Sequence, residues 1–152
     1  MIYPKTIVLR HKKENLKKCS LRGLENRSDF QFLTYPKDIV PKLSQYIVLS
    51  FEGKPLSCED EDKGLFIIDG TWKYAEVMAR MTPAIKDMET RSLPAHFKTA
   101  YPRRQEDCPF EERGLASIEA IYIAYHILKR PLDSLLDSYF WKENFLKIND
   151  LP

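Results

Sequence analysis

The stretch from Leu65 to Ala75 reads LFIIDGTWKYA. Residues 66–68 are an uninterrupted apolar run of strand-forming side chains, which is typical of a buried strand in a parallel sheet. Asp69 then starts a sharp turn, and the Thr71 hydroxyl can cap a helix that begins at Trp72. This segment therefore predicts a strand that leads through a tight turn into a helix.

The acid at this turn stands where α/β proteins bind ligands. In open α/β sheets, ligands lie at the carboxyl ends of the strands. There Asp69 could bind a hydroxyl or accept a proton, and Trp72 could supply a flat apolar wall. The alternative is an ordinary turn whose tryptophan fills the core, and single turns of this kind are common. The segment alone leaves both interpretations open.

Strands and helices alternate along the rest of the chain, which favours an α/β fold with a mainly parallel sheet and flanking helices. We expect a short helix or ordered loop at 16–26, a turn at 51–56, a solvated acidic loop at 59–62, and Pro83 to end or kink the helix after Trp72. Further strands are expected at 6–9, 45–50 and 97–101, and further helices at 115–129 and 132–146.

Length and composition indicate one globular domain. The 152 residues suffice to bury roughly two-thirds of the unfolded surface. We divide residues 1–152 into a basic N-terminal segment (1–45), a ligand-binding core (46–131) and a C-terminal helix (132–152). No apolar run approaches the ~20 residues of a membrane span, and Cys19, Cys58 and Cys108 lack disulfide or zinc spacing. We therefore expect a cytoplasmic, metal-free monomer.

The charge is unevenly distributed along the chain. Residues 1–50 carry ten basic and four acidic side chains, a balance of +6, whereas the other 102 carry fourteen and eighteen, a balance of −4. Most of the basic excess lies between Arg10 and Arg27. This basic cluster is either a contact surface for a phosphate backbone or simply a solvated face. Its members are Arg10, Lys12, Lys13, Lys17, Lys18, Arg22 and Arg27.

Glu119 is the unusual residue of the apolar helix predicted at 115–129. A buried carboxylate needs a partner, and Arg91, Arg103 and Arg104 are the candidates. Such a pairing would hold loops around a pocket, and simple exposure of Glu119 is the alternative. His126, on the same helix, is interpreted as a packed or surface residue and not as a catalytic base.

Four segments, in this order, resemble a known family. Residues 68–72, Ile-Asp-Gly-Thr-Trp, resemble the acid–x–Thr–Trp motif of the DTW-domain proteins. Residues 91–94 (RSLP), 101–104 (YPRR) and 114–120 (GLASIEA) are similar to its later blocks. Residues 17–24 and 48–50 are closer to the related ribosomal RNA aminocarboxypropyltransferases.

The resemblance implies both a fold and an activity. The fold would be similar to that of the SPOUT methyltransferases, an α/β domain with a deep trefoil knot. The activity would be transfer of the 3-amino-3-carboxypropyl group of S-adenosylmethionine to a uracil-type nitrogen in RNA. The target would be tRNA in the DTW branch and small-subunit rRNA in the other. The chain lacks the cysteine-rich N-terminal cluster of many DTW proteins, so both targets stay open.

The resemblance also implies where the cofactor and the reacting base would lie. Ile68 would contact the ribose through its backbone, and Asp69 matches the acid most closely tied to activity. It would either accept the proton of the target nitrogen or bind the cofactor. The other implied cofactor-binding residues are Trp72 and Ala75 near the sulfonium, Leu49, Leu93 and Leu115 around adenine, Cys19 and Ser20 at the aminocarboxypropyl tail, and Ser117 at the helix start.

For RNA we expect contacts from Lys12, Lys13, Lys17, Lys18, Arg22, Arg103 and Arg104. Two alternatives to the aminocarboxypropyltransferase stay open. A methyltransferase of the same fold would differ only in which carbon faces the nucleophile. A non-catalytic RNA- or ribosome-binding module would keep the scaffold and tolerate loss of the Asp69 carboxylate.

Overall fold

The protein is described by a computed structural model that covers residues 3–13, 21–70, 72–101 and 115–152. These residues form a five-stranded sheet with the strand order β2-β1-β4-β3-β5, and every neighbouring pair is parallel. The predicted α/β class with a parallel sheet is therefore confirmed. The strands are β1 (Thr6–His11), β2 (Phe30–Tyr35), β3 (Tyr46–Pro55), β4 (Gly64–Asp69) and β5 (Glu89–Ser92).

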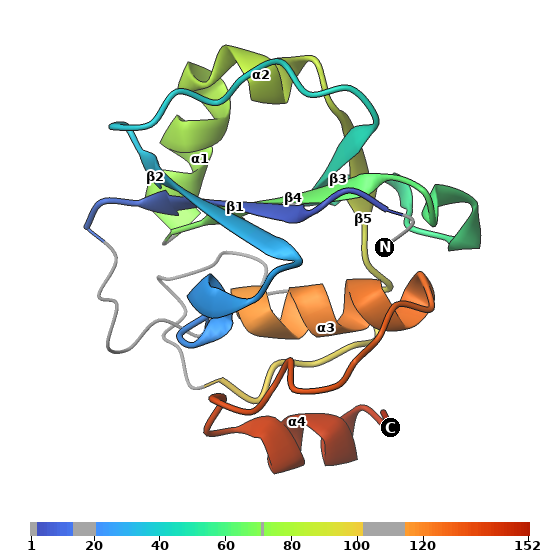
Figure 1. Ribbon diagram of the computed structural model, residues 1–152. Coiled ribbons are helices and arrows are strands. Elements are labelled where there is room, and N and C mark those ends of the chain that lie inside the picture. The colour runs from blue at the N-terminus through green and yellow to red at the C-terminus, as the bar shows by residue number, and fades with distance from the viewer. Residues whose placement is uncertain (1–2, 14–20, 71, 102–114) are drawn as a thin grey trace.

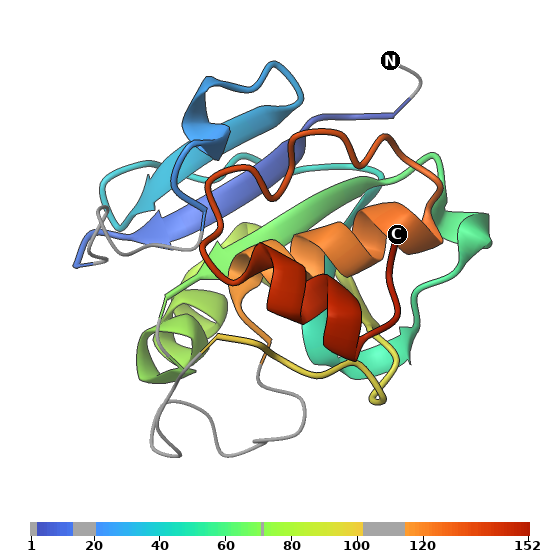
Figure 2. The ribbon, with the colours of Figure 1, turned by 90° about the horizontal axis from the view of Figure 1, so that it is seen from below.

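Helices cover both faces of the sheet. The helix α1 (Trp72–Met81) and the short α2 (Pro83–Lys86) lie on one face, and α3 (Ser117–Ile127) lies on the other (Figure 1). Seen from below, α4 (Lys142–Ile148) lies over α3, on the side away from the sheet (Figure 2). Two 3₁₀ turns, η1 (Leu24–Asn26) and η2 (Cys58–Asp60), complete the elements of the described residues.

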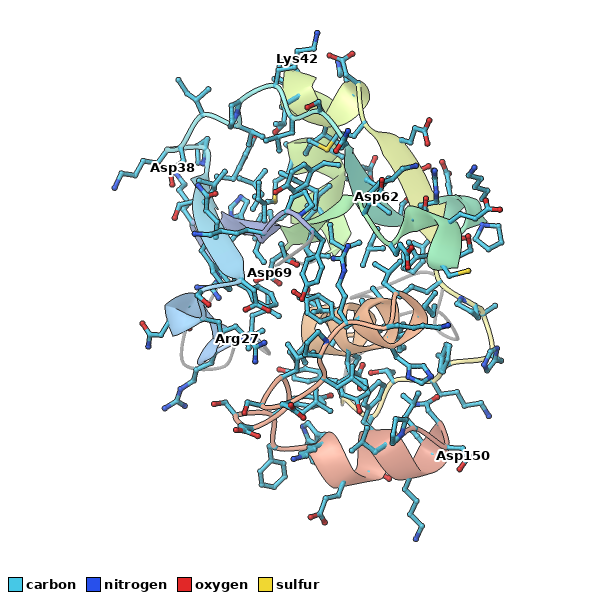
Figure 3. The ribbon with its side chains drawn as sticks, turned by 45° about the vertical axis from the view of Figure 1, so that its right-hand side comes forward. Arg27, Asp38, Lys42, Asp62, Asp69 and Asp150 are labelled. Atoms are coloured by element: carbon cyan, nitrogen blue, oxygen red, sulfur yellow. The ribbon has the colours of Figure 1, made fainter. Side chains whose placement is uncertain are left out.

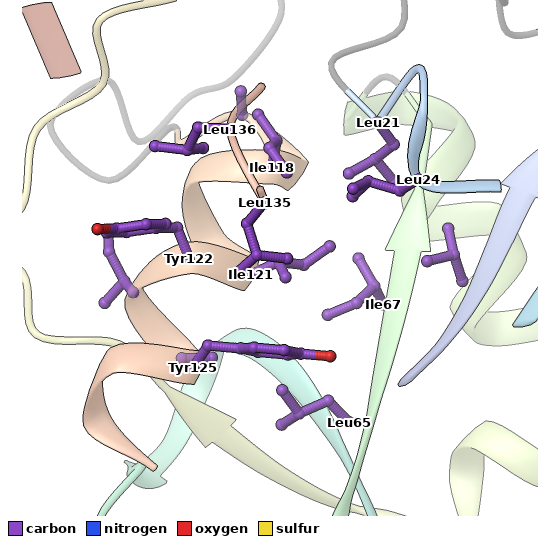
Figure 4. Close-up of a cluster of buried hydrophobic side chains, with 14 of the residues drawn as sticks. Leu21, Leu24, Leu65, Ile67, Ile118, Ile121, Tyr122, Tyr125, Leu135 and Leu136 are labelled. Carbon is purple, nitrogen blue, oxygen red and sulfur yellow. The ribbon is translucent and has the colours of Figure 1, made fainter. Parts of the chain in front are cut away.

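The central strands separate two hydrophobic clusters because successive side chains of a strand point to opposite faces. In β4, Leu65 and Ile67 belong to the cluster under α3 (Figure 4), whereas Phe66 belongs to the cluster under α1 and α2. The same alternation places Asp69 on the α3 side. Helix α3 itself is buried almost all round because the sheet covers one side of it and the C-terminal segment another.

Most predicted elements of the core are found. The strands at 6–9, 45–50 and 66–68 and the helices at 72–82 and 115–129 are present, and Pro83 separates α1 from α2. Strands β2 and β5 are additional to the prediction. Within the described residues, no helix is long and apolar enough to cross a membrane.

The turn predicted at 51–56 is wrong, because β3 runs on to Pro55. Its pairing with Arg91 of β5 shifts from Leu49 to Lys54, so the residues between them form a bulge. Gly53 has φ +101° there, and a Cβ atom on it would come within 2.6 Å of the Thr90 carbonyl oxygen. Glycine therefore marks a bulge at this position rather than the end of the strand.

Two other predictions are wrong. Residues 97–101 are not a strand, because the Ala100 N–H and the Thr99 hydroxyl donate to the Glu119 side chain of α3 and the segment does not pair with a neighbouring strand. The helix predicted at 132–146 is helical only from Lys142 onward. Ser134 has φ +66°, a left-handed conformation that a continuous helix excludes.

The acidic loop predicted at 59–62 is only partly solvated. Asp60 is buried and pairs with Arg91 (3.1 Å) and Lys63 (3.2 Å). Burial by itself would raise the pKa of Asp60, but hydrogen bonds from Arg91, the Ser57 N–H and Lys63, with the Arg91 charge, lower it below its ordinary value. This ion pair fixes the loop before β4 to the edge strand β5.

Candidate active site at the carboxyl ends of β1 and β4

Asp69 ends β4 and lies at the meeting point of three elements. Its Oδ1 accepts a hydrogen bond from the Ser117 hydroxyl at the start of α3 (2.8 Å), and its Oδ2 lies 3.5 Å from Arg10 Nε of β1. The carboxylate is 5% exposed, and Arg10 is its register partner on the adjacent strand. Figure 3 shows Asp69 near the centre of the molecule, in contrast to Asp38, Lys42 and Asp150 at the periphery.

Arg10 is not a surface cation, contrary to its place in the predicted basic cluster. It is 8% exposed, and its guanidinium lies between two carboxylates, Asp69 and Glu25, the latter at 3.1 Å from Nη1. Its Cζ lies 4.6 Å from the centre of the Phe32 ring. Buried guanidinium groups are found with such carboxylate partners because an unpaired buried charge is costly.

Arg27, another member of that predicted cluster, is also paired. Its guanidinium binds both carboxylate oxygens of Asp29, at 2.9 and 3.0 Å. For Glu25, burial alone would raise the pKa, but backbone N–H groups and the Arg10 side chain lower it below its ordinary value. The charge cluster read from the sequence is thus partly an internal network of ion pairs.

His11 lies on the opposite side of the same sheet edge. Its ring stacks on Tyr74 of α1, with centroids 3.9 Å apart and planes within 6°. Its Nδ1 accepts a hydrogen bond from the Lys13 N–H (3.0 Å). Burial, followed by the charges of Lys13 and Lys12, lowers the pKa of His11. His11 is therefore a neutral imidazole at neutral pH, and it fixes the turn that presents the two lysines.

All three predicted adenine-contacting residues lie on one side of the sheet. Leu49, Leu93 and Leu115 are each partly exposed and pack against the hydrophobic cluster under α3. Ile68 packs against the cluster under α1 and is partly exposed, as is Ala75. Ser117 contacts Asp69 directly. Cys19, Ser20 and the Trp72 side chain lie outside the described residues.

The predicted RNA-binding residues that the structure describes are on the surface. Lys12, Lys13 and Arg22 are exposed. The other four, Lys17, Lys18, Arg103 and Arg104, lie outside the described residues. Arg22 also lines a depression of about 250 Å³ between residues 22–27 and 134–138, and no other predicted site residue in the described part of the chain lines it.

Glu119 is completely buried and holds the walls around this site. Its Oε1 accepts bonds from the Thr99 hydroxyl (2.6 Å) and the Ala116 N–H (2.8 Å). Its Oε2 accepts bonds from the Ala100 N–H and the Tyr139 hydroxyl, both 2.8 Å. The partner is not Arg91, as the sequence suggested, because Arg91 pairs with Asp60 and Glu89. Arg103 and Arg104 lie outside the described residues.

Sequence reasoning placed Asp69 at the end of a strand, as found, but missed its partner Arg10 and the second partner of Arg10, Glu25. A signal was present: Arg10 directly follows the apolar strand 6–9, as Asp69 follows 66–68. Since the carboxyl ends of adjacent parallel strands meet, two opposite charges in these positions predict a pair. Glu25 and the His11–Tyr74 stack gave no comparable signal, because nothing local in the sequence brings them to the strand ends.

A family model for the DTW domain matches residues 2–142. Among solved structures, the chain is similar to the SAM-dependent rRNA:acp-transferase Tsr3 from Vulcanisaeta distributa. The two are 25% identical with a TM-score of 0.75, over 99% of this chain and 80% of that one. Curated proteins give no significant match. With a family match over nearly its whole length and the parallel α/β fold described above, the chain belongs to the DTW-domain family.

Proposed function

We propose that the protein is an S-adenosylmethionine-dependent aminocarboxypropyltransferase that modifies a uridine-type base in RNA. The observation that carries this proposal is the Asp69 carboxylate, fixed by Ser117 and Arg10 at the carboxyl ends of two central parallel strands. It lies within a DTW domain, on a fold similar to that of an rRNA acp-transferase. The RNA is either tRNA or small-subunit rRNA.

The residues at this edge fit the cofactor. Leu49, Leu93 and Leu115 offer partly exposed apolar surface, which suits the flat face of an adenine. Asp69 offers a carboxylate, which suits a ribose hydroxyl or the positive sulfonium. Ile68, Trp72, Ala75, Ser117, Cys19 and Ser20 complete the proposed cofactor site.

When bound, S-adenosylmethionine would supply the aminocarboxypropyl group: its bond to sulfur would break, with the electron pair going to sulfur, as the bond to the base nitrogen formed. Asp69 then accepts or orients the proton that this imide nitrogen loses. Ser117 and Arg10 fix the rotation of the carboxylate, so that one geometry is presented to the base.

We expect RNA to approach the carboxyl ends of β1 and β4 from the side that carries the exposed basic residues. Lys12 and Lys13 follow β1 directly and are exposed, and Arg22 is exposed close by in the sequence. Together with Lys17, Lys18, Arg103 and Arg104 they would contact phosphates. We also propose the three-part division at 45/46 and 131/132, a monomeric state and a cytoplasmic location, as expected from the sequence, and a trefoil knot, as the family resemblance implies.

The test is to follow two labels of S-adenosylmethionine into RNA. The protein is incubated with tRNA or with small ribosomal subunits and with cofactor labelled either in the methyl carbon or in the carboxyl carbon. We expect the carboxyl label to enter RNA and the methyl label to stay in the nucleoside by-product. Mass spectrometry of digested RNA then identifies the modified nucleoside.

Each alternative has its own outcome. Transfer of the methyl label would identify a methyltransferase and overturn the proposal. RNA binding without transfer of either label would identify a non-catalytic module, provided that the protein is folded and the RNA is unmodified beforehand. RNA from cells that lack the protein is therefore the substrate of choice.

A further inference from the structure

Arg10 pairs with two carboxylates that belong to different parts of the chain. Its Nε lies 3.5 Å from Asp69 of β4, and its Nη1 lies 3.1 Å from Glu25 of η1. The guanidinium is buried, and the Phe32 ring lies against it. A planar guanidinium can hold two acceptors at once in a fixed relative orientation, which a lysine ammonium cannot do.

Glu25 also binds the segment that precedes it in the chain. Its second oxygen, Oε1, accepts a hydrogen bond from the Gly23 N–H (2.8 Å). Gly23 has φ +96°, so the chain turns here in a conformation that favours glycine. Leu21 and Leu24 on either side are buried under α3. The position of residues 21–25 relative to β1 is thus set jointly by core packing and by the Glu25–Arg10 pair.

We propose that Arg10 is a positioning residue that aligns Asp69 with the segment 21–25, so that the transfer step depends on it more than cofactor binding does. Cys19 and Ser20, proposed to hold the aminocarboxypropyl tail, precede Leu21 directly in the sequence. Arg10 would therefore fix the acid at the target base relative to the part of the chain that holds the migrating group. This inference rests on the proposed function.

The size of the effect follows from how sensitive transfer reactions are to alignment. A displacement of about 1 Å between reacting groups can lower a rate about 100-fold. In Arg10→Lys the fork that holds Asp69 Oδ2 beside Glu25 is lost, so the orientation of the Asp69 carboxylate relative to residues 21–25 becomes less fixed. The residues proposed to contact adenine and ribose, Leu49, Leu93, Leu115 and Ile68, pack against the hydrophobic clusters on the two faces of the sheet and should keep their places.

The test compares Arg10→Lys with Arg91→Lys. Arg91 is a matched control because it is also buried and also lies between two carboxylates, Asp60 (3.1 Å) and Glu89 (2.7 Å). We expect Arg10→Lys to lower kcat about 30- to 100-fold and to change the Kd for S-adenosylmethionine no more than about threefold. Arg91→Lys should lower the urea midpoint while keeping kcat within about twofold.

Each other outcome decides the question. If folded Arg10→Lys keeps kcat within about twofold of the natural protein, or changes kcat and Kd in the same proportion, Arg10 is only structural and the proposal is overturned. If Arg10→Lys does not fold, Glu25→Gln replaces it, because this side chain is 37% exposed and its loss is tolerable. We then expect kcat to fall five- to tenfold, which corresponds to a loss of about 1 kcal/mol of transition-state stabilisation. An unchanged kcat would overturn the proposal. Absence of transfer by the natural protein would instead contradict the proposed function itself.

Discussion

Two buried carboxylates near the start of α3 are held in opposite ways. Glu119 receives four hydrogen bonds, two from backbone N–H groups and two from hydroxyls, and all four donors are neutral. Asp69 receives a hydroxyl bond from Ser117 and lies beside the cationic Arg10, which it shares with Glu25. Glu119 lies inside the protein, whereas Asp69 lies at the carboxyl end of β4.

Under the proposed function, this difference would distinguish a structural acid, Glu119, from a reactive one, Asp69. The partners of Glu119 come from 99–100, from residue 116 and from Tyr139, so this carboxylate ties together three segments that surround the site. Asp69 lies where three elements end or begin, which is where a ligand can reach it in an α/β fold. Burial of a carboxylate by itself therefore does not identify a catalytic residue in this molecule.

Loss of the Asp69 charge should have the largest effect on activity. In Asp69→Asn the side chain keeps its shape but cannot accept a proton, and general base catalysis is worth about 100- to 10,000-fold in rate. We expect a loss of that size in single-turnover transfer by a protein that stays folded. Its urea midpoint should fall about as much as that of Asp60→Asn, because each variant removes one of two carboxylates from a buried arginine. Asp62→Asn, at an exposed acid, is the control. Unchanged turnover in Asp69→Asn would remove this residue from the mechanism.

Loss of the Glu119 charge should instead affect stability. Each carboxylate oxygen accepts one backbone N–H, so in Glu119→Gln the amide NH₂ must face one of these donors whichever way it is oriented. We expect the free energy of unfolding in urea to fall by about 2–4 kcal/mol. Glu143→Gln on the exposed side of α4 should leave it unchanged. A folded Glu119→Gln protein that had lost transfer as completely as Asp69→Asn would contradict the distinction between the two acids.

Asp60 tests whether an arginine partner alone identifies a site. The lowered pKa of Asp60 means that its stabilising contribution is present above the unfolded pKa, near 4, and is lost as the pH falls through the folded value. We expect unfolding free energy to fall between pH 5 and pH 3. Asp60→Asn should cost about 1–3 kcal/mol at pH 7 and flatten that slope. Its kcat should stay near that of the natural protein, and a large loss of kcat would extend the site to this ion pair.

The exposed lysines at the end of β1 should have a smaller effect, limited to RNA binding. Each phosphate contact contributes a nearly constant amount to the salt dependence of affinity. In the double variant Lys12→Glu and Lys13→Glu, the slope of log affinity against log salt should decrease by about 1–2. Lys42→Glu and Lys86→Glu, also exposed, are the controls. Equal slopes would mean that Lys12 and Lys13 are solvated and do not contact RNA.

The smallest expected effect concerns His11. Its pKa is lowered by burial and by Lys13 and Lys12, so the folded protein binds fewer protons than the unfolded chain just below pH 6.5. The stability due to neutral His11 is therefore complete above pH 6.5 and is lost as the pH falls through the folded value. Urea unfolding between pH 7.5 and pH 5.5 should show a small decrease that His11→Gln removes. The same decrease in His11→Gln would assign it to another group.

The elements with strong periodicity could be predicted from sequence, and the irregular ones could not. The apolar run before Asp69 and the long apolar stripe of α3 specify a buried strand and a buried helix whatever surrounds them. Strand β2 was missed because its side chains are mostly only partly buried, so the sequence shows no continuous apolar run there. Residues 97–101 were predicted as a strand because their pattern does not reveal that Glu119 accepts hydrogen bonds from the Ala100 N–H and the Thr99 hydroxyl.

The place of Asp69 in the fold could be predicted from the sequence, whereas its contacts could not. Asp69 follows a strand that is recognisable locally, and that placed it at a ligand-binding edge. The pairing of Arg10 with Glu25 depends on how η1 packs against β1 and β2, which is a tertiary property. For the same reason, Arg10 and Arg27 were assigned to a surface cluster, although both pair with carboxylates. Net charge along a sequence does not tell which charges fold inward.

Amide hydrogen exchange with and without S-adenosylmethionine tests most directly whether the carboxyl edge of β1 and β4 is the ligand site. We predict slower exchange in peptides covering residues 66–75, 93–101 and 115–120 when the cofactor is present. Unchanged exchange there at saturating cofactor, or protection confined to the depression between residues 22–27 and 134–138, would contradict this account.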